Sequence, residues 1–325
     1  MHICNNSIVR NCIEIDGDLN RESKGETSLA LGDQIRKETI KQAVKSAFVR
    51  SITEVPSDVM EALSRAAETE SSERGRRYLA ILLENARRAR TEKTVICLDT
   101  GVPTFFVRTP LDFPYRGSLR DAFDEALREL TEGEFPLRSV VVDPFSREDR
   151  GGNCAENIPL IHAEIDNGID YMEITSYPKG SGSGIFGRVE MLPQTAGIAG
   201  VKKFVVDAVA HAGTKPCPPI IVGVGVGGPM EEVARLATMA SARPISQRHR
   251  ESRIAALEKE LCEALNLIGI GPMGTGGSTS VLAVNVEYSG THRPWMPVAV
   301  NINCWPGRRA VCRVYRDGRV EPVQA

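Results

Sequence analysis

Three of the eight cysteines share a sequence context that suits metal binding. Cys97 is followed by Leu-Asp-Thr-Gly, Cys217 lies between prolines ahead of an apolar run, and Cys304 ends a β-rich run before Trp-Pro-Gly-Arg-Arg. None of the three belongs to a Cys-x-x-Cys pair, which disfavours a structural zinc finger and a thioredoxin-type dithiol. Three dispersed thiolates would suit an iron–sulfur cluster with one iron left open. Spacing alone also allows each of them to be a packed structural residue.

Asp99 stands two residues after Cys97, in the stretch CLDTG. A thiolate and a carboxylate both resist desolvation, so this pair is unusual at the end of an apolar run. Three interpretations of Cys97 stay open at this point: a packed small hydrophobe, a nucleophile, or a ligand whose partners lie far along the chain.

The other cysteines have simpler interpretations. Cys4 and Cys12 lie in a polar N-terminal stretch and indicate no site. Cys262 falls on the apolar side of a predicted helix and Cys312 lies in an alternating strand pattern, which favours core packing for both. Cys154, in the stretch GGNCAENIP, allows either a structural or a functional role.

One glycine-rich stretch matches the dinucleotide-binding fingerprint. Gly223, Gly225 and Gly228 follow an apolar run and precede a predicted helix, which is the pattern of an NAD-dependent oxidoreductase. The acidic residue expected about 20 positions later is missing, because that region is ASARPISQRHR. Glycine-rich loops with free N–H groups can equally hold a carboxylate near a metal centre.

The elements that must position these residues are of both types. Residues 1–32 are polar without sustained periodicity, which predicts a loosely ordered extension before a domain over residues 33–325. Apolar residues at three- and four-residue spacing, from Asp33 on, predict that the first hundred residues form a helical layer. The stretch ending at Cys97 is predicted to be a buried strand. Further predicted strands are Thr104–Arg108, Ser139–Asp143, Tyr171–Ser176, Pro219–Val224, Val281–Tyr288 and Pro297–Asn303, with helices at Met230–Ala242 and Glu251–Leu267. The fold class is therefore α/β (mixed α+β), with the site at strand ends.

The bulk composition excludes several classes of function. The net charge of −2 gives no basic field for nucleic acid, and the 42% hydrophobic and 25% charged residues are ordinary for a globular protein. No apolar run approaches the roughly 20 residues of a membrane-spanning helix. The N-terminus lacks the apolar region of a secretory signal, so we expect a cytoplasmic protein with reduced thiols.

Several motifs in one order give the chain a family resemblance. CLDTG, PKGSGSG, CPPIIVGVGVGG, IGPMGTGGSTSVLAVNVE, THRP and NCWPGRRA resemble the α domain of class I iron–sulfur fumarases, and equally the α subunit of L(+)-tartrate dehydratase. The resemblance runs from about Asp33 to Val314. It implies an oxygen-sensitive [4Fe–4S] hydro-lyase whose cluster ligands correspond to Cys97, Cys217 and Cys304. The iron without a protein ligand would bind the substrate and act as a Lewis acid.

The resemblance also implies roles for other residues. Asp99 corresponds to the aspartate that takes part in proton transfer near the leaving hydroxyl. His292 and the backbone N–H of Gly180 correspond to donors for a substrate carboxylate. Arg138, in PLRSVVVDP, is a further match to a substrate-binding arginine. Without the resemblance, His292 and Arg138 would be interpreted as surface charges.

Two departures from the family pattern affect the substrate. Leu98 stands where the family usually has Gln, and Gly184-Ile185 stands where it usually has Glu-Asn. Both changes make the substrate-binding pocket less polar. A site built to bind a polar group discriminates against ligands that lack it, so the loss of polar groups predicts a different substrate. We expect a substrate with a smaller or less polar group on the side that faces Leu98.

The resemblance finally implies partners. The complete family active site includes a β domain, so we expect a separate β subunit, a small carboxylic-acid substrate, and a homodimer of α or an α2β2 assembly. Two alternatives stay open: a non-catalytic iron–sulfur sensor derived from the family, and the NAD-dependent oxidoreductase. Asp99 and His292 argue against a sensor, which would need only the cysteines.

Overall fold

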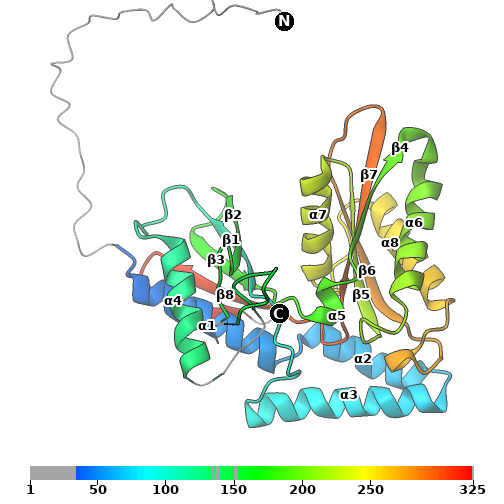
Figure 1. Ribbon diagram of the computed structural model, residues 1–325, viewed down its shortest axis with the longest axis horizontal. Helices are drawn as coiled ribbons and strands as arrows, with labels where there is room; N and C mark the ends of the chain where they lie inside the picture. The colour runs from blue at the N-terminus through cyan, green and yellow to red at the C-terminus, as the bar shows by residue number, and fades with distance from the viewer. Residues whose placement is uncertain (1–33, 134, 136–139, 150–152, 324–325) are drawn as a thin grey trace, which may run out of the picture.

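The computed structural model describes residues 34–133, 135, 140–149 and 153–323. Within them, a base of helices carries two lobes, each built around one sheet (Figure 1). The predicted mixed α/β fold class is confirmed. The extension predicted over 1–32 lies outside the described residues, and the domain over 33–325 stays a prediction. None of the described helices is long and apolar enough to cross a membrane.

The predicted helical layer is confirmed. It consists of α1 (Lys37–Thr53), α2 (Ser57–Thr69) and α3 (Glu73–Glu92). α1 buries Ile40, Val44 and Phe48 on one face, as the three- and four-residue spacing predicts. The Ser72 hydroxyl caps α3 by accepting a hydrogen bond from the Gly75 N–H at 3.2 Å. α2 and α3 lie beneath the second lobe in Figure 1.

The first lobe contains a five-stranded sheet in the order β2-β1-β3-β8-β9. Its strands are β1 (Thr104–Thr109), β2 (Leu160–Ile165), β3 (Tyr171–Ser176), β8 (Ala310–Tyr315) and β9 (Val320–Val323). β1 is parallel to β2, and the other neighbours are antiparallel. α1 and α4 (Leu119–Glu132) pack on the sheet through a shared core. The ring of Phe105 lies 6.1 Å from that of Phe48 and 4.9 Å from that of Phe123.

The second lobe contains a four-stranded sheet in the order β4-β7-β5-β6. Its strands are β4 (Arg188–Pro193), β5 (Ile220–Val226), β6 (Val281–Tyr288) and β7 (Trp295–Asn303). α6 (Gly197–Ala212) and α8 (Ser252–Asn266) cover one face and α7 (Met230–Ala242) covers the other (Figure 1). The short elements are α5 (Ser181–Gly184), η1 (Gln194–Ala196) and η2 (Pro272–Gly274).

Two glycines of the dinucleotide fingerprint serve the packing of α7 on β5. A Cβ atom on Gly223 would lie 2.2 Å from the carbonyl oxygen of Ala237, and one on Gly225 would lie 2.2 Å from that of Val233. Both glycines are inside the strand, where they let the helix backbone approach closely. The motif therefore has a structural explanation, and the NAD-dependent alternative loses its support.

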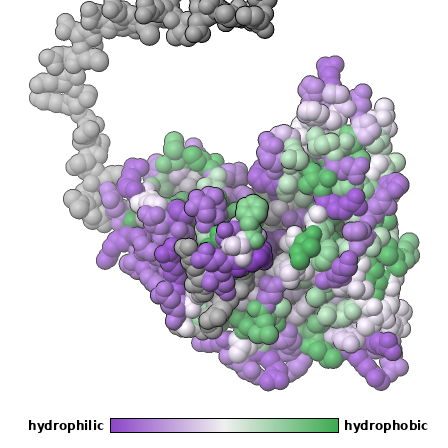
Figure 2. Space-filling view, in the orientation of Figure 1, coloured by the Kyte–Doolittle hydropathy of each residue, from purple (hydrophilic) through white to green (hydrophobic). Residues whose placement is uncertain are grey.

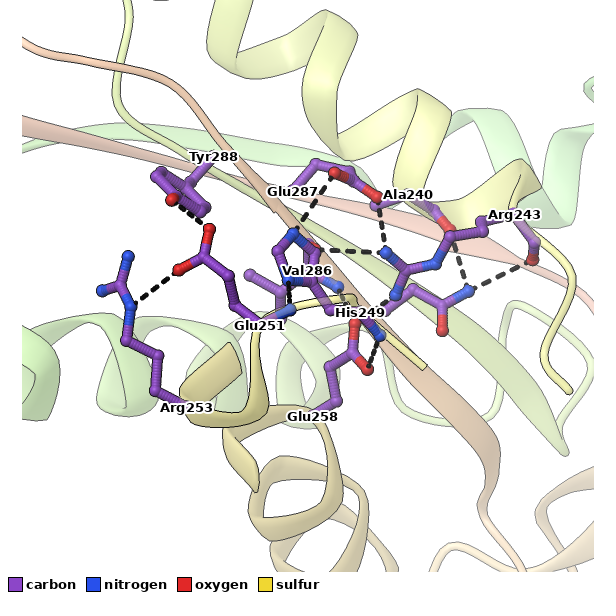
Figure 3. Close-up of polar contacts among 10 residues, drawn as sticks. Ala240, Arg243, His249, Glu251, Arg253, Glu258, Val286, Glu287 and Tyr288 are labelled. Atoms are coloured by element: carbon purple, nitrogen blue, oxygen red, sulfur yellow. Dashed lines mark hydrogen bonds and ion pairs between the residues drawn. The ribbon is translucent and has the colours of Figure 1, made fainter. Parts of the chain in front are cut away.

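A polar network fixes the loop between α7 and α8 (Figure 3). The fully buried Glu258 carboxylate accepts hydrogen bonds from the N–H of Val286 at 2.9 Å and of His249 at 3.2 Å. The Arg243 guanidinium pairs closely with Glu258 and with Glu287. These contacts satisfy a buried carboxylate and join α8 to β6.

The other strand and helix predictions have mixed outcomes. β1, β3, β5, β6, β7, α7 and α8 confirm predicted elements to within one or two residues at most ends. The strand predicted at Ser139–Asp143 is wrong over its described residues, 140–143. The strand predicted before Cys97 is also wrong, because this stretch crosses from α3 to the first sheet without pairing. Lys93 ends α3 in a left-handed conformation, and the Ile96 N–H donates to the carbonyl of Ile52 at 2.9 Å.

Candidate metal centre and active site

The pairing of β5 with β7 brings Cys217 and Cys304 together. Cys217 precedes β5, and Cys304 directly follows β7. The two strands are antiparallel neighbours, with Ile221 opposite Asn303, so the start of one meets the end of the other. The Trp305 N–H donates to the Cys217 carbonyl oxygen at 3.3 Å. The two cysteine loops are thus joined by a hydrogen bond.

The Cys97 loop joins this pair through an arginine. The chain after Cys304 turns back, with the Gly307 N–H bonded to the Cys304 carbonyl at 2.9 Å, and leaves for the first sheet. Arg308 follows this turn, and its Nη1 donates to the Asp99 carbonyl oxygen at 2.8 Å. The loop that carries Cys97 is thereby tied to the loop that carries Cys304.

The α5 turn contacts all three cysteine loops. Both the N–H and the hydroxyl of Ser181 donate to Asp99 Oδ2 at 2.6 Å. A Cβ atom on Gly182 would lie 3.5 Å from Cα of Pro216, next to Cys217. A Cβ atom on Gly180 would lie 2.7 Å from Arg308 Nη2 and 3.0 Å from Asp99 Oδ2. Position 180 therefore has no room for a side chain unless these polar groups move.

The electrostatics show that the three thiols share one environment. Burial raises the pKa of the Cys217 thiol, and the charges of Cys97 and Asp99 raise it further. Burial also raises the pKa of Cys304, where Arg308 acts in the opposite direction and the other two thiols add to the increase. The thiolate forms of Cys217 and Cys304 would be stabilised by cations, either from the protein or from a metal cluster.

The three thiols are donors of the kind that an iron–sulfur cluster uses. Among the described residues, no three His, Cys, Asp or Glu side chains converge closely enough to hold one ion. A [4Fe–4S] cluster takes each of its thiolates on a different iron, so thiols from three different loops can serve it. Two buried nitrogens flank Cys304 without a partner in the described part of the chain, Asn303 Nδ2 and Arg308 Nε. Such donors suit the sulfur atoms of a cluster.

Only some of the other predicted site residues lie near the three cysteine loops. Asp99 and Gly180 lie among the three cysteine loops, and Leu98 projects into solvent with 95% of its surface exposed. His292 is exposed in the turn between β6 and β7, beside the Trp295 ring at 5.1 Å. The nine residues of β7, about 30 Å of strand, separate this turn from Cys304. Arg138 lies outside the described residues.

Three further residues of the site were not singled out from the sequence. Ser181 and Lys179 belong to the glycine-rich turn PKGSGSG, and Arg308 belongs to NCWPGRRA. A polar side chain beside a rigid turn is the sequence signal that could have indicated each of these residues. Their partners lie 82 residues away for Ser181 and 209 residues away for Arg308, so only the fold reveals the contacts.

Comparison with known proteins agrees with this arrangement. The family model for fumarate hydratase (Fumerase) matches residues 41–313, which span the second sheet, most of the first sheet and all three cysteines. The chain belongs to this family. It is 39% identical over 284 residues to a putative L(+)-tartrate dehydratase subunit alpha of Methanocaldococcus jannaschii, covering 86% of this chain and 99% of the relative. It is 34% identical over 265 residues to the L(+)-tartrate dehydratase subunit alpha of Escherichia coli K12, covering 82% and 87%.

Family membership confirms two of the predictions. The family resemblance is correct, and the chain is a hydro-lyase of the fumarase family. The family implies an iron–sulfur cofactor in general.

Proposed function

We propose that this chain is the α subunit of a [4Fe–4S] hydro-lyase that adds water to, or eliminates it from, a small hydroxycarboxylic acid. Cys97, Cys217 and Cys304 would be the cluster ligands. The observation that carries this proposal is the junction at α5, which contacts all three cysteine loops. Three thiolates would leave one iron of a [4Fe–4S] cluster without a protein ligand and open to substrate.

Each residue of the junction has a chemical task. When bound, the cluster supplies a Lewis-acidic iron that makes hydroxide a better leaving group. Asp99 would move the proton near that hydroxyl, and the two hydrogen bonds from Ser181 hold its carboxylate in place. The Gly180 N–H would donate to a substrate carboxylate. The Arg308 guanidinium, beside Gly180, adds a positive charge at the same place.

The ligand assignment is tested by anaerobic reconstitution with iron and sulfide. We expect Cys304→Ser to bind less iron and to lose most of the broad visible absorption band. The matched control is Cys262→Ser, because this partly buried thiol lies on α8 and packs in the core of the second lobe. Wild-type iron content in Cys304→Ser would show that the assignment is wrong.

Leu98 and Ile185 support a substrate with an apolar group. Leu98 is 95% exposed and Ile185 is 67% exposed. They flank the Asp99–Ser181 contact, since Leu98 precedes Asp99 and the Ile185 N–H bonds to the Ser181 carbonyl at 3.2 Å. Large apolar side chains gain from burial, and an alkyl group of the substrate would cover them.

The substrate proposal is tested with Leu98→Gln. We expect the ratio of kcat/KM for fumarate or tartrate over an alkyl-substituted analogue to rise about tenfold, which is about 1.4 kcal/mol. Leu267→Gln, at an 88% exposed leucine after α8, is the matched control. Equal or better turnover of fumarate than of any alkyl analogue by the wild type would contradict the proposal.

Partner chains are part of the proposal. The relatives are named subunit alpha, which supports a separate β subunit. Figure 2 shows hydrophobic residues on the face of the second lobe, and Val189 and Met191 of the edge strand β4 are exposed with Ile198 of α6. An exposed edge strand with apolar side chains favours contact with another chain, in a homodimer of α or an α2β2 assembly.

The position of His292 bears on this assembly. Since β7 separates His292 from Cys304, a contact of His292 with substrate would have to be made at a site on another chain. Coexpression with the product of a neighbouring β-type gene, then light scattering and turnover under argon, tests the assembly. Dehydration of a hydroxy acid by the complex supports the enzyme, whereas a cluster without turnover of any hydroxy acid would favour the sensor.

We also propose a cytoplasmic location. The six cysteines in the described part of the chain are free thiols, and reduced thiols suit the cytoplasm. Cell fractionation with detection of the native protein tests this.

A further inference from the structure

Lys179 connects the loop of Cys97 to the strand that ends at Cys304. Its backbone forms two hydrogen bonds with Val102, from the Val102 N–H at 2.9 Å and to the Val102 carbonyl at 3.0 Å. Its side chain extends to β7, where Nζ donates to the Ile302 carbonyl at 3.1 Å and makes a close contact with Asn301 Oδ1. One residue thus holds two of the three cysteine segments.

A neutral polar network surrounds the Lys179 ammonium group. Nζ lies 5.3 Å from the centre of the Tyr177 ring, and the Tyr177 hydroxyl is 2.7 Å from Ser241 Oγ. Asn301 Nδ2 donates to Thr238 Oγ1 at 2.8 Å, which turns Asn301 Oδ1 toward Nζ. A partly buried side chain held from several sides in this way has a fixed position.

The ammonium group has no carboxylate partner among the described residues. Its recorded contacts are an amide oxygen, a carbonyl oxygen and an aromatic ring, and no ion pair to it is found in that part of the chain. Burial lowers the pKa of Lys179 to about 7, the Cys304 thiolate acts to raise it, and Arg308 acts to lower it. A desolvated cation is costly without an anion nearby, and a negative charge at Cys304 is the nearby charge that would stabilise this one.

We propose that Lys179 is a positioning residue and the internal counter-cation of the iron–sulfur centre. It fixes the Cys304 end of β7 against the Cys97 loop and offsets the negative charge of the thiolates and their cluster. This inference rests on the proposed function. Two of the three ammonium donors bond to Asn301 and Ile302 of β7, the strand that Cys304 directly follows, and the third has no hydrogen-bond partner among the described residues.

The test compares charge at position 179 in the reconstituted full-length protein. Lys179→Gln keeps a donor for β7 but removes the charge, and Lys179→Arg keeps the charge. Removing a cation disfavours the reduced, more negative cluster. We expect Lys179→Gln to shift the reduction equilibrium about tenfold toward the oxidised cluster, about 59 mV for one electron, and to bleach faster in air. Lys179→Arg should stay near the wild type.

Two further variants keep the test decisive. Lys202→Gln is the matched control, because this lysine of α6 pairs with Glu260 on the surface, and its potential should equal that of the wild type. Asn301→Asp places a carboxylate beside Nζ without truncating a side chain. It should lower the potential in the same direction as Lys179→Gln, and it carries the test if Lys179→Gln does not fold.

The outcomes separate this inference from the proposed function. A wild-type chain that takes up no cluster overturns both. A wild type with a cluster, and variants at 179 and 301 with the same potential and bleaching rate, overturns the role of Lys179 alone. A change confined to the KM for substrate, with the potential of the substrate-free protein unchanged, would assign Lys179 to substrate binding and also overturn the inference.

Discussion

Glu70 stabilises the fold by joining two distant loops through backbone hydrogen bonds. Its buried carboxylate, after the end of α2, accepts hydrogen bonds from the N–H groups of Ser72 at 2.9 Å, Ser278 at 2.8 Å and Thr279 at 2.8 Å. It therefore ties the start of α3 to the glycine-rich loop that follows α8. The same loop braces the metal centre, because the Met273 N–H donates to the Pro218 carbonyl at 2.7 Å, next to Cys217.

The magnitude follows from the pKa of Glu70. Burial acts to raise this pKa, but the backbone hydrogen bonds outweigh it and lower the pKa from 4.5 to about 2. A difference of about 2.5 pH units corresponds to about 3.4 kcal/mol of unfolding free energy. Because the folded-state pKa is depressed, this stability is fully present above about pH 4.5 and is lost as the pH falls through about 2.

Glu70→Gln removes the charge at every pH. We expect urea unfolding to show a free energy of unfolding about 3 kcal/mol below that of the wild type at pH 7. The gap should narrow to about 1.4 kcal/mol at pH 3, since the wild type is then only about one pH unit above the folded-state pKa. Glu68→Gln, at an exposed glutamate of α2, is the control and should change little. A gap below 1 kcal/mol at pH 7, or one of equal size at pH 3, would refute this reasoning.

Two further predictions concern packing and buried charge. Gly225→Ala should lower the free energy of unfolding by about 1–3 kcal/mol, because the new methyl group meets the α7 backbone. Gly290→Ala is the control, because a methyl group there has open space and should be tolerated. Equal thermal stabilities of the two variants would contradict this prediction. Asp58→Asn should cost about 3–5 kcal/mol in chemical unfolding, since it leaves the buried Arg309, now 2.6 Å from Asp58 Oδ1, without a counter-charge. Glu260→Gln breaks a surface ion pair and should lower the free energy of unfolding by under about 1 kcal/mol. A similar loss in Glu260→Gln and Asp58→Asn would contradict the role of burial.

Local patterns predicted the regular elements well. β3, β6 and α7 have the bounds that alternation and helical spacing indicate, because these signals lie within the segment itself. The strand predicted before Cys97 does not form, because the signal within a segment does not determine whether another strand pairs with it. A short apolar run has the same composition whether or not a neighbouring strand pairs with it, and pairing is decided by distant residues.

The candidate site likewise contains some residues that the sequence indicates and others that only the fold indicates. The three cysteines stand out from their turns and prolines, and the family match spans all three. The contacts of Lys179 and Arg308 do not stand out, because a lysine beside glycines is ordinary until the fold places it against β7. The separation of His292 from Cys304, in contrast, follows from the sequence, because the predicted strand Pro297–Asn303 lies between them and an extended strand keeps its two ends apart.

The location of the three cysteines has a consequence for cluster assembly. Cys97 lies where the chain passes from the helical base to the first sheet, Cys217 lies at the entry to the second sheet, and Cys304 lies at the return from the second sheet to the first. A cluster on these thiols would connect the base and both lobes. The hydrogen bonds of Arg308 and Ser181 with the Cys97 loop already make these connections in protein alone. A preorganised site pays less ordering entropy on binding, so the apo chain should take up its cluster without refolding.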